Sequence, residues 1–318
     1  MASFNLIIGA FFVAHITYGY FVERRNKQEI TRVFGQYVPK ELVKDLSDNP
    51  NDLGLEGESR DMTVLFSDVR SFTTISEKLD PRQLKELMNA YLTPVTAIIY
   101  RNRGTVDKYI GDAVMAFWGA PLTSKRHAQD AVASGLSMLQ EAAKMRADFK
   151  ARGWPELYIG IGINTGSMNV GNMGSEYRVA YTVLGDAVNL GARLEGLTKF
   201  YGVEMIVSEF TRQEAPAFVY RELDKVRVKG KGLPVTIYEP LGLQGEVPQQ
   251  QMTFLQRYDS ALAAYRQRRW DEAQQILESL MSDDRKHRLY ELYLERTTHY
   301  RENPPGEDWD SVFTLSFK

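Results

Sequence analysis

The stretch VDKYIGDAVMAF, residues 106–117, places a lysine and an aspartate on either side of one glycine, between two apolar runs. The flanks have the composition of strands, and Ile110-Gly111-Asp112 has that of the tight turn between them, because glycine supplies the backbone freedom that a hairpin needs. A solvated hairpin tip also fits the pattern, since charged residues are common in turns. The surrounding sequence decides between a structural and a functional role.

Long helical patterns and further strand patterns surround this hairpin. DMTVLFSDV (61–69) has the pattern of a buried strand, and residues 81–102 and 127–153 have the periodicity of long amphipathic helices. More strands are expected at residues 158–166, 181–185, 205–209 and, as a pair, 226–241, with a helix at 186–200. Long helices alternating with a mixed set of strands predict an α+β fold in which helices pack on a sheet.

The composition of the 318 residues argues against several classes of function. A formal net charge of −2 gives no overall basic field, so a nucleic-acid partner is not supported. The absence of cysteine from the sequence excludes disulfides, thiolate nucleophiles and cysteine-ligated zinc. The four histidines are scattered and form no HExxH pair, which argues against a zinc hydrolase and a Ser-His-Asp triad.

The N-terminal region has the pattern of a membrane segment. Residues 4–22 carry no Asp, Glu, Lys or Arg, and they approach the roughly 20 residues that a spanning helix requires. Two arginines and a lysine follow within residues 24–27, whereas a signal peptide carries its positive charge before the apolar run. We therefore expect a transmembrane helix at residues 1–23 with its C-terminal side in the cytoplasm. A buried or partner-packed helix is the alternative, favoured by Asn5, His15 and Thr17.

The rest of the chain divides by composition into three parts. Residues 24–58 have the pattern of a helical connector, interrupted at Pro39 and followed by a polar, turn-rich link. Residues 59–241 hold the strands and long helices, and residues 242–318 form a C-terminal helical appendage. The spacing within residues 258–281 resembles one helical hairpin of a tetratricopeptide repeat, although such a repeat needs a neighbour to bury its face.

Two aspartates follow predicted strands. Asp68 comes directly after the apolar run TVLF, and Asp112 lies at the hairpin tip. Carboxylates at neighbouring strand ends suit a divalent metal, because Mg²⁺ takes one or two carboxylates together with substrate phosphates. Two such ions can hold both the attacking and the leaving oxygen of a phosphoryl displacement. Two unrelated turn carboxylates are the alternative.

A second polar cluster lies in TVLGDAVNLGARLE, residues 182–195. Asp186 has the position of a helix N-cap, and Asn189 and Arg193 then lie four residues apart on one helix face. An amide and a guanidinium together suit a pentavalent phosphate or a developing oxyanion, although a solvated helix face is the alternative.

Other glycine-rich patterns carry less information. GIGINTG (160–166) lacks the GxGxxG spacing, and no P-loop motif occurs, so neither a Rossmann enzyme nor a P-loop NTPase is supported. VKGKG (228–232) places Lys229 either near a triphosphate or in a basic turn.

Four motifs together resemble the catalytic domain of class III adenylyl cyclases: FSDVRSFT (66–73), KYIGDAVMAFWG (108–119), GSEYRVAYTVLGDAVNLGARLE (174–195) and VKGKG (228–232). The resemblance covers about residues 59–241 and implies a ferredoxin-like class III nucleotidyl cyclase domain. It also implies a head-to-tail homodimer in which each active site is built from both chains. The C-terminal appendage, expected as a helical hairpin, lies outside it.

The resemblance also implies a role for each matching residue. Asp68, Asp112 and the backbone carbonyl of Val69 match the ligands of two Mg²⁺ or Mn²⁺ ions, which bind the triphosphate and activate the ribose 3′-hydroxyl. From the other chain, the matching residues are Lys108 and Thr182 for adenine selection, Asn189 for the ribose, Arg193 for the pentavalent phosphate, Lys229 for the terminal phosphates and Arg178 as a further phosphate candidate.

The chain thus resembles a membrane-attached, homodimeric adenylyl cyclase that makes cyclic AMP and pyrophosphate from ATP at the inner or plasma membrane. Many relatives have aspartate where this chain has Thr182, and threonine resembles a bacterial subclass often reported to respond to bicarbonate. Residues 24–43 resemble the connector of bacterial receptor cyclases. A guanylyl cyclase is one alternative, although such enzymes tend to have glutamate and cysteine where Lys108 and Thr182 stand. A catalytically silent dimerisation or nucleotide-sensing module is another.

Overall fold

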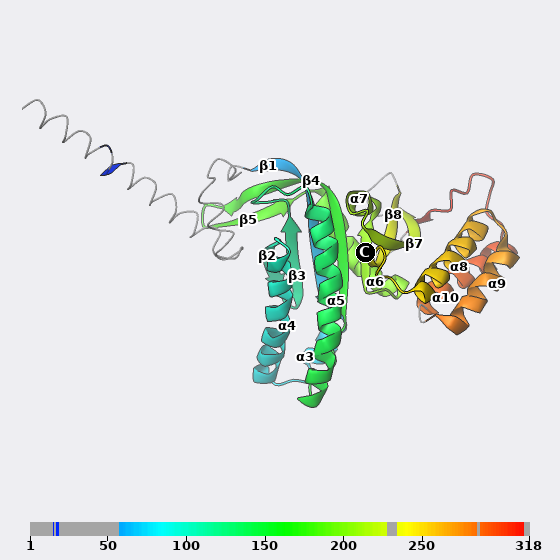
Figure 1. Ribbon diagram of the computed structural model, residues 1–318, viewed down its shortest axis with the longest axis horizontal. Coiled ribbons are helices and arrows are strands. Elements are labelled where there is room, and N and C mark those ends of the chain that lie inside the picture. Colours follow the sequence, from blue (N-terminus) through cyan, green and yellow to red (C-terminus); the bar gives the residue numbers. More distant parts are fainter. Residues whose placement is uncertain (1–14, 16, 19–56, 228–233, 285–286, 315–318) are drawn as a thin grey trace, which may run out of the picture.

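Residues 58–175 fold into the expected ferredoxin-like arrangement. The computed structural model describes residues 15, 17–18, 57–227, 234–284 and 287–314 (Figure 1). The elements follow in the order β1 (Glu58–Val69), α3 (Phe72–Ser76), α4 (Pro81–Arg101), β2 (Thr105–Ile110), β3 (Ala113–Trp118), α5 (His127–Ala151) and β4 (Ile159–Ser175). The sheet order β2-β3-β1-β4, with every neighbouring pair antiparallel, is that of a βαββαβ fold.

The sheet continues beyond β4 and becomes mixed. Its further strands are β5 (Arg178–Leu184), β6 (Met205–Ser208), β7 (Phe218–Arg227), β8 (Val235–Leu243) and β9 (Phe313–Thr314). β6 is parallel to β4, β8 and β7 follow as antiparallel neighbours, and β9 runs parallel to the end of β7. β5 pairs with the second half of β4 as a long hairpin. The predicted α+β class with a mixed sheet is therefore confirmed.

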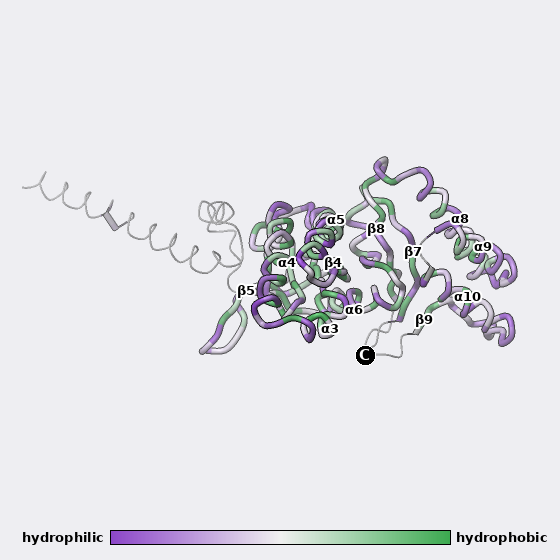
Figure 2. The backbone as a smooth tube through the Cα atoms, turned by 90° about the horizontal axis from the view of Figure 1, so that it is seen from below, coloured by the Kyte–Doolittle hydropathy of each residue, from purple (hydrophilic) through white to green (hydrophobic). Residues whose placement is uncertain are grey.

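Helices cover both faces of the sheet. Along β1, Leu65 and Val69 join the core that includes α4 and α5, while Met62 and Val64 belong to the core of the opposite face. Figure 1 shows α4 and α5 side by side, and Figure 2 shows that both helices contain hydrophobic and hydrophilic residues. The opposite face carries α6 (Asp186–Tyr201), and the short α7 (Glu209–Glu214) follows β6.

Helix α6 lies unusually close to strand β4. A Cβ atom on Gly162 would lie 2.1 Å from the backbone nitrogen of Glu195 and 2.5 Å from the carbonyl oxygen of Gly191. Only glycine at this position lets the helix backbone rest directly on the strand. The predicted N-cap is wrong by one residue, because Gly185 (φ +148°) is the N-cap and no side-chain cap bond forms there.

The C-terminal part contains three helices rather than the expected hairpin: α8 (Gln249–Arg266), α9 (Trp270–Asp283) and α10 (His287–Glu302). α8 and α9 form the predicted pair. α10 escaped prediction because the face that it buries is apolar only at Leu289, Tyr290, Leu292 and Tyr293 and continues with the polar residues Arg296 and Thr297. The resemblance to a tetratricopeptide repeat stays a prediction.

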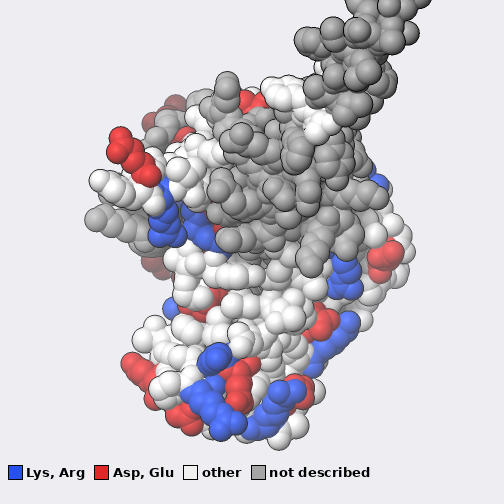
Figure 3. All heavy atoms as spheres, turned by 90° about the vertical axis from the view of Figure 1, so that its left-hand side faces the viewer, with Lys and Arg blue, Asp and Glu red and all other residues white. Residues whose placement is uncertain are grey.

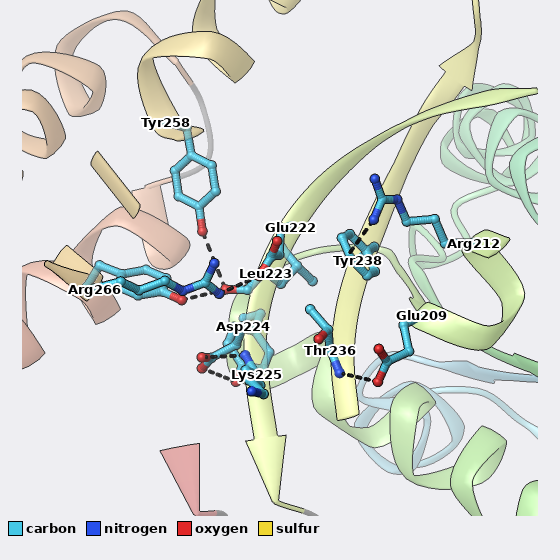
Figure 4. A network of polar contacts seen from close by, with 12 residues as sticks. Glu209, Arg212, Glu222, Leu223, Asp224, Lys225, Thr236, Tyr238, Tyr258 and Arg266 are labelled. Atoms are coloured by element: carbon cyan, nitrogen blue, oxygen red, sulfur yellow. Dashed lines mark hydrogen bonds and ion pairs between the residues drawn. The ribbon is translucent and has the colours of Figure 1, made fainter. Parts of the chain in front are cut away.

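The three C-terminal helices share a core with β7, β8 and α6. The hydroxyls of Tyr258 and Tyr293 donate to the carbonyl oxygen of Leu223 at 3.4 and 2.7 Å. Arg266 of α8 pairs with Glu222 of β7, and Figure 4 shows this contact beside Tyr258. The C-terminal helices are thus packed onto the end of the sheet rather than separate from it.

The expected transmembrane helix (1–23) and most of the expected connector (24–58) lie outside the described residues. Within the part of the chain that the structure describes, no helix has both the length and the apolar character needed to cross a bilayer. On the face shown in Figure 3, acidic and basic side chains are interspersed among the described residues, in keeping with the small net charge.

Candidate active site

The two predicted metal-binding aspartates lie beside each other. Asp68 is close to the end of β1, and Asp112 is in the turn between β2 and β3. Because β1 pairs with β3, with Ser67 opposite Val114, that turn lies next to the end of β1. The backbone nitrogen of Val69 donates to Asp112 Oδ2 at 3.2 Å. The structure therefore brings together all three residues proposed for the metals.

The electrostatics of this site favour a bound cation. Burial, and next the neighbouring Asp68 carboxyl, raise the pKa of Asp112 to about 6. A cation bound beside the two carboxyls would offset their repulsion and lower the pKa of Asp112 again. Within the described residues, no group of three or more acidic or histidine side chains gathers around a metal position. Two carboxylates are nevertheless the number that Mg²⁺ uses when phosphate oxygens complete its shell.

Two charged residues near the aspartates were missed in the sequence. Burial, and then Asp68, raise the pKa of Glu195 on α6 to about 7, while Arg70 opposes this shift. Arg70 donates to Thr198 Oγ1, and a Cβ on Gly160 would contact Thr198, Glu195 and Arg70 alike. One signal in the sequence could have pointed to Glu195. It follows Gly191 by four positions, so it lies on the same face of α6 as that glycine, which is the face that packs against the sheet.

The two predicted base-reading residues also meet. Lys108 of β2 and Thr182 of β5 are 74 positions apart in the chain, and Lys108 Nζ lies 3.5 Å from Thr182 Oγ1. Asp107, which sequence reasoning did not single out, joins them. Thr182 Oγ1 donates to Asp107 Oδ2 at 2.5 Å, and Asp107 Oδ1 lies 3.2 Å from Lys108 Nζ. The three polar groups form one cluster.

The remaining predicted residues form no described hydrogen bond with either cluster. Asn189 and Arg193 are exposed on α6, where they share one face as predicted. Among the described residues, neither side chain forms a hydrogen bond with Asp68, Asp112 or Lys108. Arg178 is exposed at the start of β5, and Lys229 lies outside the described residues. One chain thus holds two groups of polar contacts, one around Asp112 and one around Lys108.

Comparison with known proteins finds similar sequences and a matching family model. The family model described as "Adenylate and Guanylate cyclase catalytic domain" matches residues 56–240. Adenylate cyclase 1 of Rhizobium meliloti is 33% identical over 211 residues, which cover 66% of this chain and 32% of that protein. Adenylate cyclase of Anabaena cylindrica is 34% identical over 217 residues, covering 65% of this chain and 42% of that protein. The chain therefore spans well under half of the length of these two relatives.

Solved structures show the same similarity. The adenylyl cyclase CyaB from P. aeruginosa matches with a TM-score of 0.56 and 36% identity, covering 61% of this chain and 100% of that chain. The guanylyl cyclase Cya2 matches with a TM-score of 0.56 and 34% identity, covering 61% of this chain and 97% of that chain. Both nucleotide specificities thus occur among structures with this fold.

Proposed function

Because the chain belongs to the adenylate and guanylate cyclase catalytic-domain family, we propose that it converts ATP to 3′,5′-cyclic AMP and pyrophosphate. The observation that carries the choice of ATP is the contact between Lys108 and Thr182, 3.5 Å apart. An ammonium donates and a hydroxyl accepts, which matches the acceptor N1 and the donor 6-amino group of adenine. The relatives named adenylate cyclase support the same choice.

In this reaction the ribose O3′ forms a bond to the α-phosphorus, the bond from that phosphorus to the bridging oxygen breaks, pyrophosphate leaves and the hydroxyl proton is released. Arg193 would stabilise the negative charge on the oxygens of the pentavalent phosphate, and Asn189 would orient the ribose. Lys229 and Arg178 would contact the phosphates. Two divalent metal ions, held by Asp68, Asp112 and the Val69 carbonyl, would supply positive charge to the hydroxyl and the triphosphate.

We further propose a head-to-tail homodimer with shared sites. Its support is the exposure of Asn189 and Arg193 on α6, where among the described residues neither side chain forms a hydrogen bond with Asp68 or Asp112. A second copy of the chain brings the complementary group to each site.

The first test is a cyclase assay on the purified chain. With Mn²⁺ or Mg²⁺ and ATP, we expect cyclic AMP and a specific activity that rises with protein concentration, because dilution separates the dimer. Omission of the metal or addition of a chelator should abolish the product. Cyclic GMP from GTP as the main product would overturn the assignment of ATP, and no product at any concentration would favour a silent module.

Mixing inactive variants tests the shared site. We expect Asp68→Ala and Arg193→Ala to be inactive alone. In an equimolar mixture they should recover about a quarter of wild-type activity, because half of the dimers are mixed and each of these has one intact site. The matched control is Asp68→Ala mixed with Asp112→Ala, which damage the same half and should give no recovery. Equal behaviour of both mixtures in verified heterodimers would contradict the model.

The base-reading role has its own test. The double substitution Lys108→Glu with Thr182→Cys should move the ratio of kcat/KM values from ATP towards GTP, because glutamate accepts from the guanine N1–H where lysine cannot. An unchanged ratio in a folded double variant would remove these two residues from base selection.

We also propose that residues 1–23 attach the chain to the inner or plasma membrane. The connector would then be residues 24–58, the catalytic domain, on the cytoplasmic side, residues 59–241, and the appendage residues 242–318. Its support is the uncharged run of residues 4–22 followed by basic residues. The full chain should sediment with membranes and resist extraction by high salt. Release by salt alone would contradict a spanning helix.

Bicarbonate regulation is a final proposal, supported by threonine at position 182. The rate of cyclic AMP formation should change when bicarbonate is added at fixed pH and fixed ionic strength. A rate equal to that with added chloride would end the proposal.

A further inference from the structure

The pairing of β2 with β3 is irregular at one residue next to the base-reading cluster. The register shifts between Val106 and Lys108, so that Asp107 is an extra residue in β2, as in a β-bulge. Bulges often redirect a side chain beside a functional site. Here the shift turns Asp107 inward: its side chain is 1% exposed, whereas that of Lys108 is 47% exposed.

The buried carboxyl of Asp107 is shared between the two residues that face the base. Its Oδ2 accepts a hydrogen bond from Thr182 Oγ1 at 2.5 Å. Its Oδ1 forms no hydrogen bond within the described residues and has Lys108 Nζ 3.2 Å away. A charged group buried in this way is costly unless its neighbours satisfy it, so the arrangement of Thr182 and Lys108 is constrained.

The direction of the bond from Thr182 has a chemical consequence. A threonine hydroxyl has one proton, and otherwise it both donates and accepts. When that proton is directed to Asp107, the oxygen can only accept from a ligand. The Lys108 ammonium can only donate. The pair then offers one acceptor and one donor, which is complementary to the adenine edge and opposed to the guanine edge, where O6 accepts and N1–H donates.

We propose that Asp107 is a specificity-determining positioning residue, which directs the Thr182 hydroxyl proton away from the nucleotide and thereby makes the site select adenine over guanine. The inference rests on the proposed function for the identity of the ligand. It assigns no contact between Asp107 and the base, because Asp107 acts through Thr182.

The test measures nucleotide binding separately from catalysis. 3′-Deoxy-ATP and 3′-deoxy-GTP lack the attacking hydroxyl, so their dissociation constants can be measured with Mg²⁺ at equilibrium on the full chain. We expect the preference for the adenine analogue to fall by about tenfold or more in Asp107→Ala, because the freed hydroxyl can then donate to O6.

Asp107→Asn keeps the shape of the side chain and guards against loss of folding in the alanine variant. Its amide oxygen would face the Lys108 ammonium and its NH₂ would face Thr182, so the threonine proton would point to the nucleotide. The preference should therefore fall at least as far as in Asp107→Ala. An unchanged preference in folded Asp107→Asn would overturn the inference.

A double-mutant cycle separates positioning from a general structural effect. Thr182→Val removes the hydroxyl, so adding Asp107→Asn to it should change the preference little. An equal drop in both backgrounds would overturn the role through Thr182. If the wild type binds the adenine analogue selectively but makes no cyclic AMP, the proposed activity fails while this inference stands. If neither analogue binds, both fail.

Discussion

His127, the first residue of α5, ends a chain of buried hydrogen bonds. Its Nδ1 lies 2.8 Å from Thr63 Oγ1, which is 2.8 Å from Thr165 Oγ1. Thr165 donates to Thr211, and Thr211 donates to the Ile163 carbonyl. Each hydroxyl has a single proton, so this order leaves Nδ1–H of His127 as the first donor. Burial lowers the pKa of His127 below its ordinary value of 6.5, and the adjacent helix N-terminus also disfavours a cation.

This lowered pKa predicts acid sensitivity. The unfolded chain binds the His127 proton at higher pH than the folded chain, so the contribution to stability is present above the unfolded pKa and is lost as the pH falls. Urea unfolding at about pH 7.5 and about pH 5.5 should therefore show a smaller loss of free energy in His127→Gln than in the wild type. The exposed His299, replaced by glutamine, is the control and should behave as the wild type does. If the free energy of unfolding fell equally between the two pH values in the wild type, His127→Gln and His299→Gln, His127 would not be the source of the acid sensitivity.

Residues that sit in contiguous patterns were predictable from the sequence, whereas those that depend on tertiary geometry were not. Asp68 lies near the end of one strand and Asp112 in the turn between two others, and the apolar patterns of these strands are visible in the local sequence. The two aspartates lie together because β1 and β3 are neighbours in the sheet. Asp107 was missed because the register shift that buries it depends on how β2 pairs with β3. Glu195 was missed because its burial depends on the approach of α6 to Gly162.

At the scale of elements, Gly162 allows the short distance between α6 and strand β4. Gly162→Ala would place a Cβ 2.1 Å from the Glu195 nitrogen, a backbone atom that cannot swing aside. We expect a loss of about 1–3 kcal/mol in the free energy of unfolding, as in other overpacked cores. Cyclase activity should also fall, because α6 carries Asn189 and Arg193.

Gly196 supplies a matched control on the same helix. A Cβ there meets nothing within 4 Å. Gly196→Ala should therefore leave activity unchanged and raise stability by up to about 1 kcal/mol, because alanine is the better helix former. Chemical denaturation of both variants checks the pair. A Gly162→Ala protein as stable as the wild type would mean that α6 can lift from β4 at no cost.

The element missed in the sequence shows a limit of periodicity. α8 and α9 were predicted because their buried apolar positions recur through the helix, whereas the buried face of α10 is completed by the polar residues Arg296 and Thr297. The burial of α10 depends on its packing against β7 and α8. Tyr293 of α10 and Tyr258 of α8 both donate to the carbonyl oxygen of Leu223 in β7. Such contacts are not visible in local sequence.

At the scale of the whole molecule, one buried ion pair ties the C-terminal helices to the catalytic domain. Arg296 of α10 lies 2.7 Å from Asp224 of β7, and Tyr201 of α6 donates to the same carboxyl oxygen at 2.7 Å. Removing one partner of such a pair leaves the other charge buried.

Asp224→Asn should therefore cost about 3–5 kcal/mol in the free energy of unfolding. The control is Asp283→Asn, which breaks the more exposed pair between Arg257 and Asp283 and should leave the free energy of unfolding close to that of the wild type. Thermal and urea unfolding should show a single transition for the wild type, because α6, β7 and α10 share one core. A separate early transition of the C-terminal helices would contradict this.

The β2–β3 hairpin carries Asp112 in its turn and Lys108 on its first strand, and this has a genetic consequence in the proposed dimer. Each subunit would contribute a metal-binding half to one active site and a base-reading half to the other. An allele such as Asp68→Ala damages only the metal-binding half. In a cell that expresses both alleles, the number of working sites therefore falls in proportion to the fraction of wild-type subunits. An allele that collapses the hairpin damages both halves at once, so working sites fall with the square of that fraction. The first kind of allele would be inherited as a simple loss of dose, and the second as a partial dominant negative.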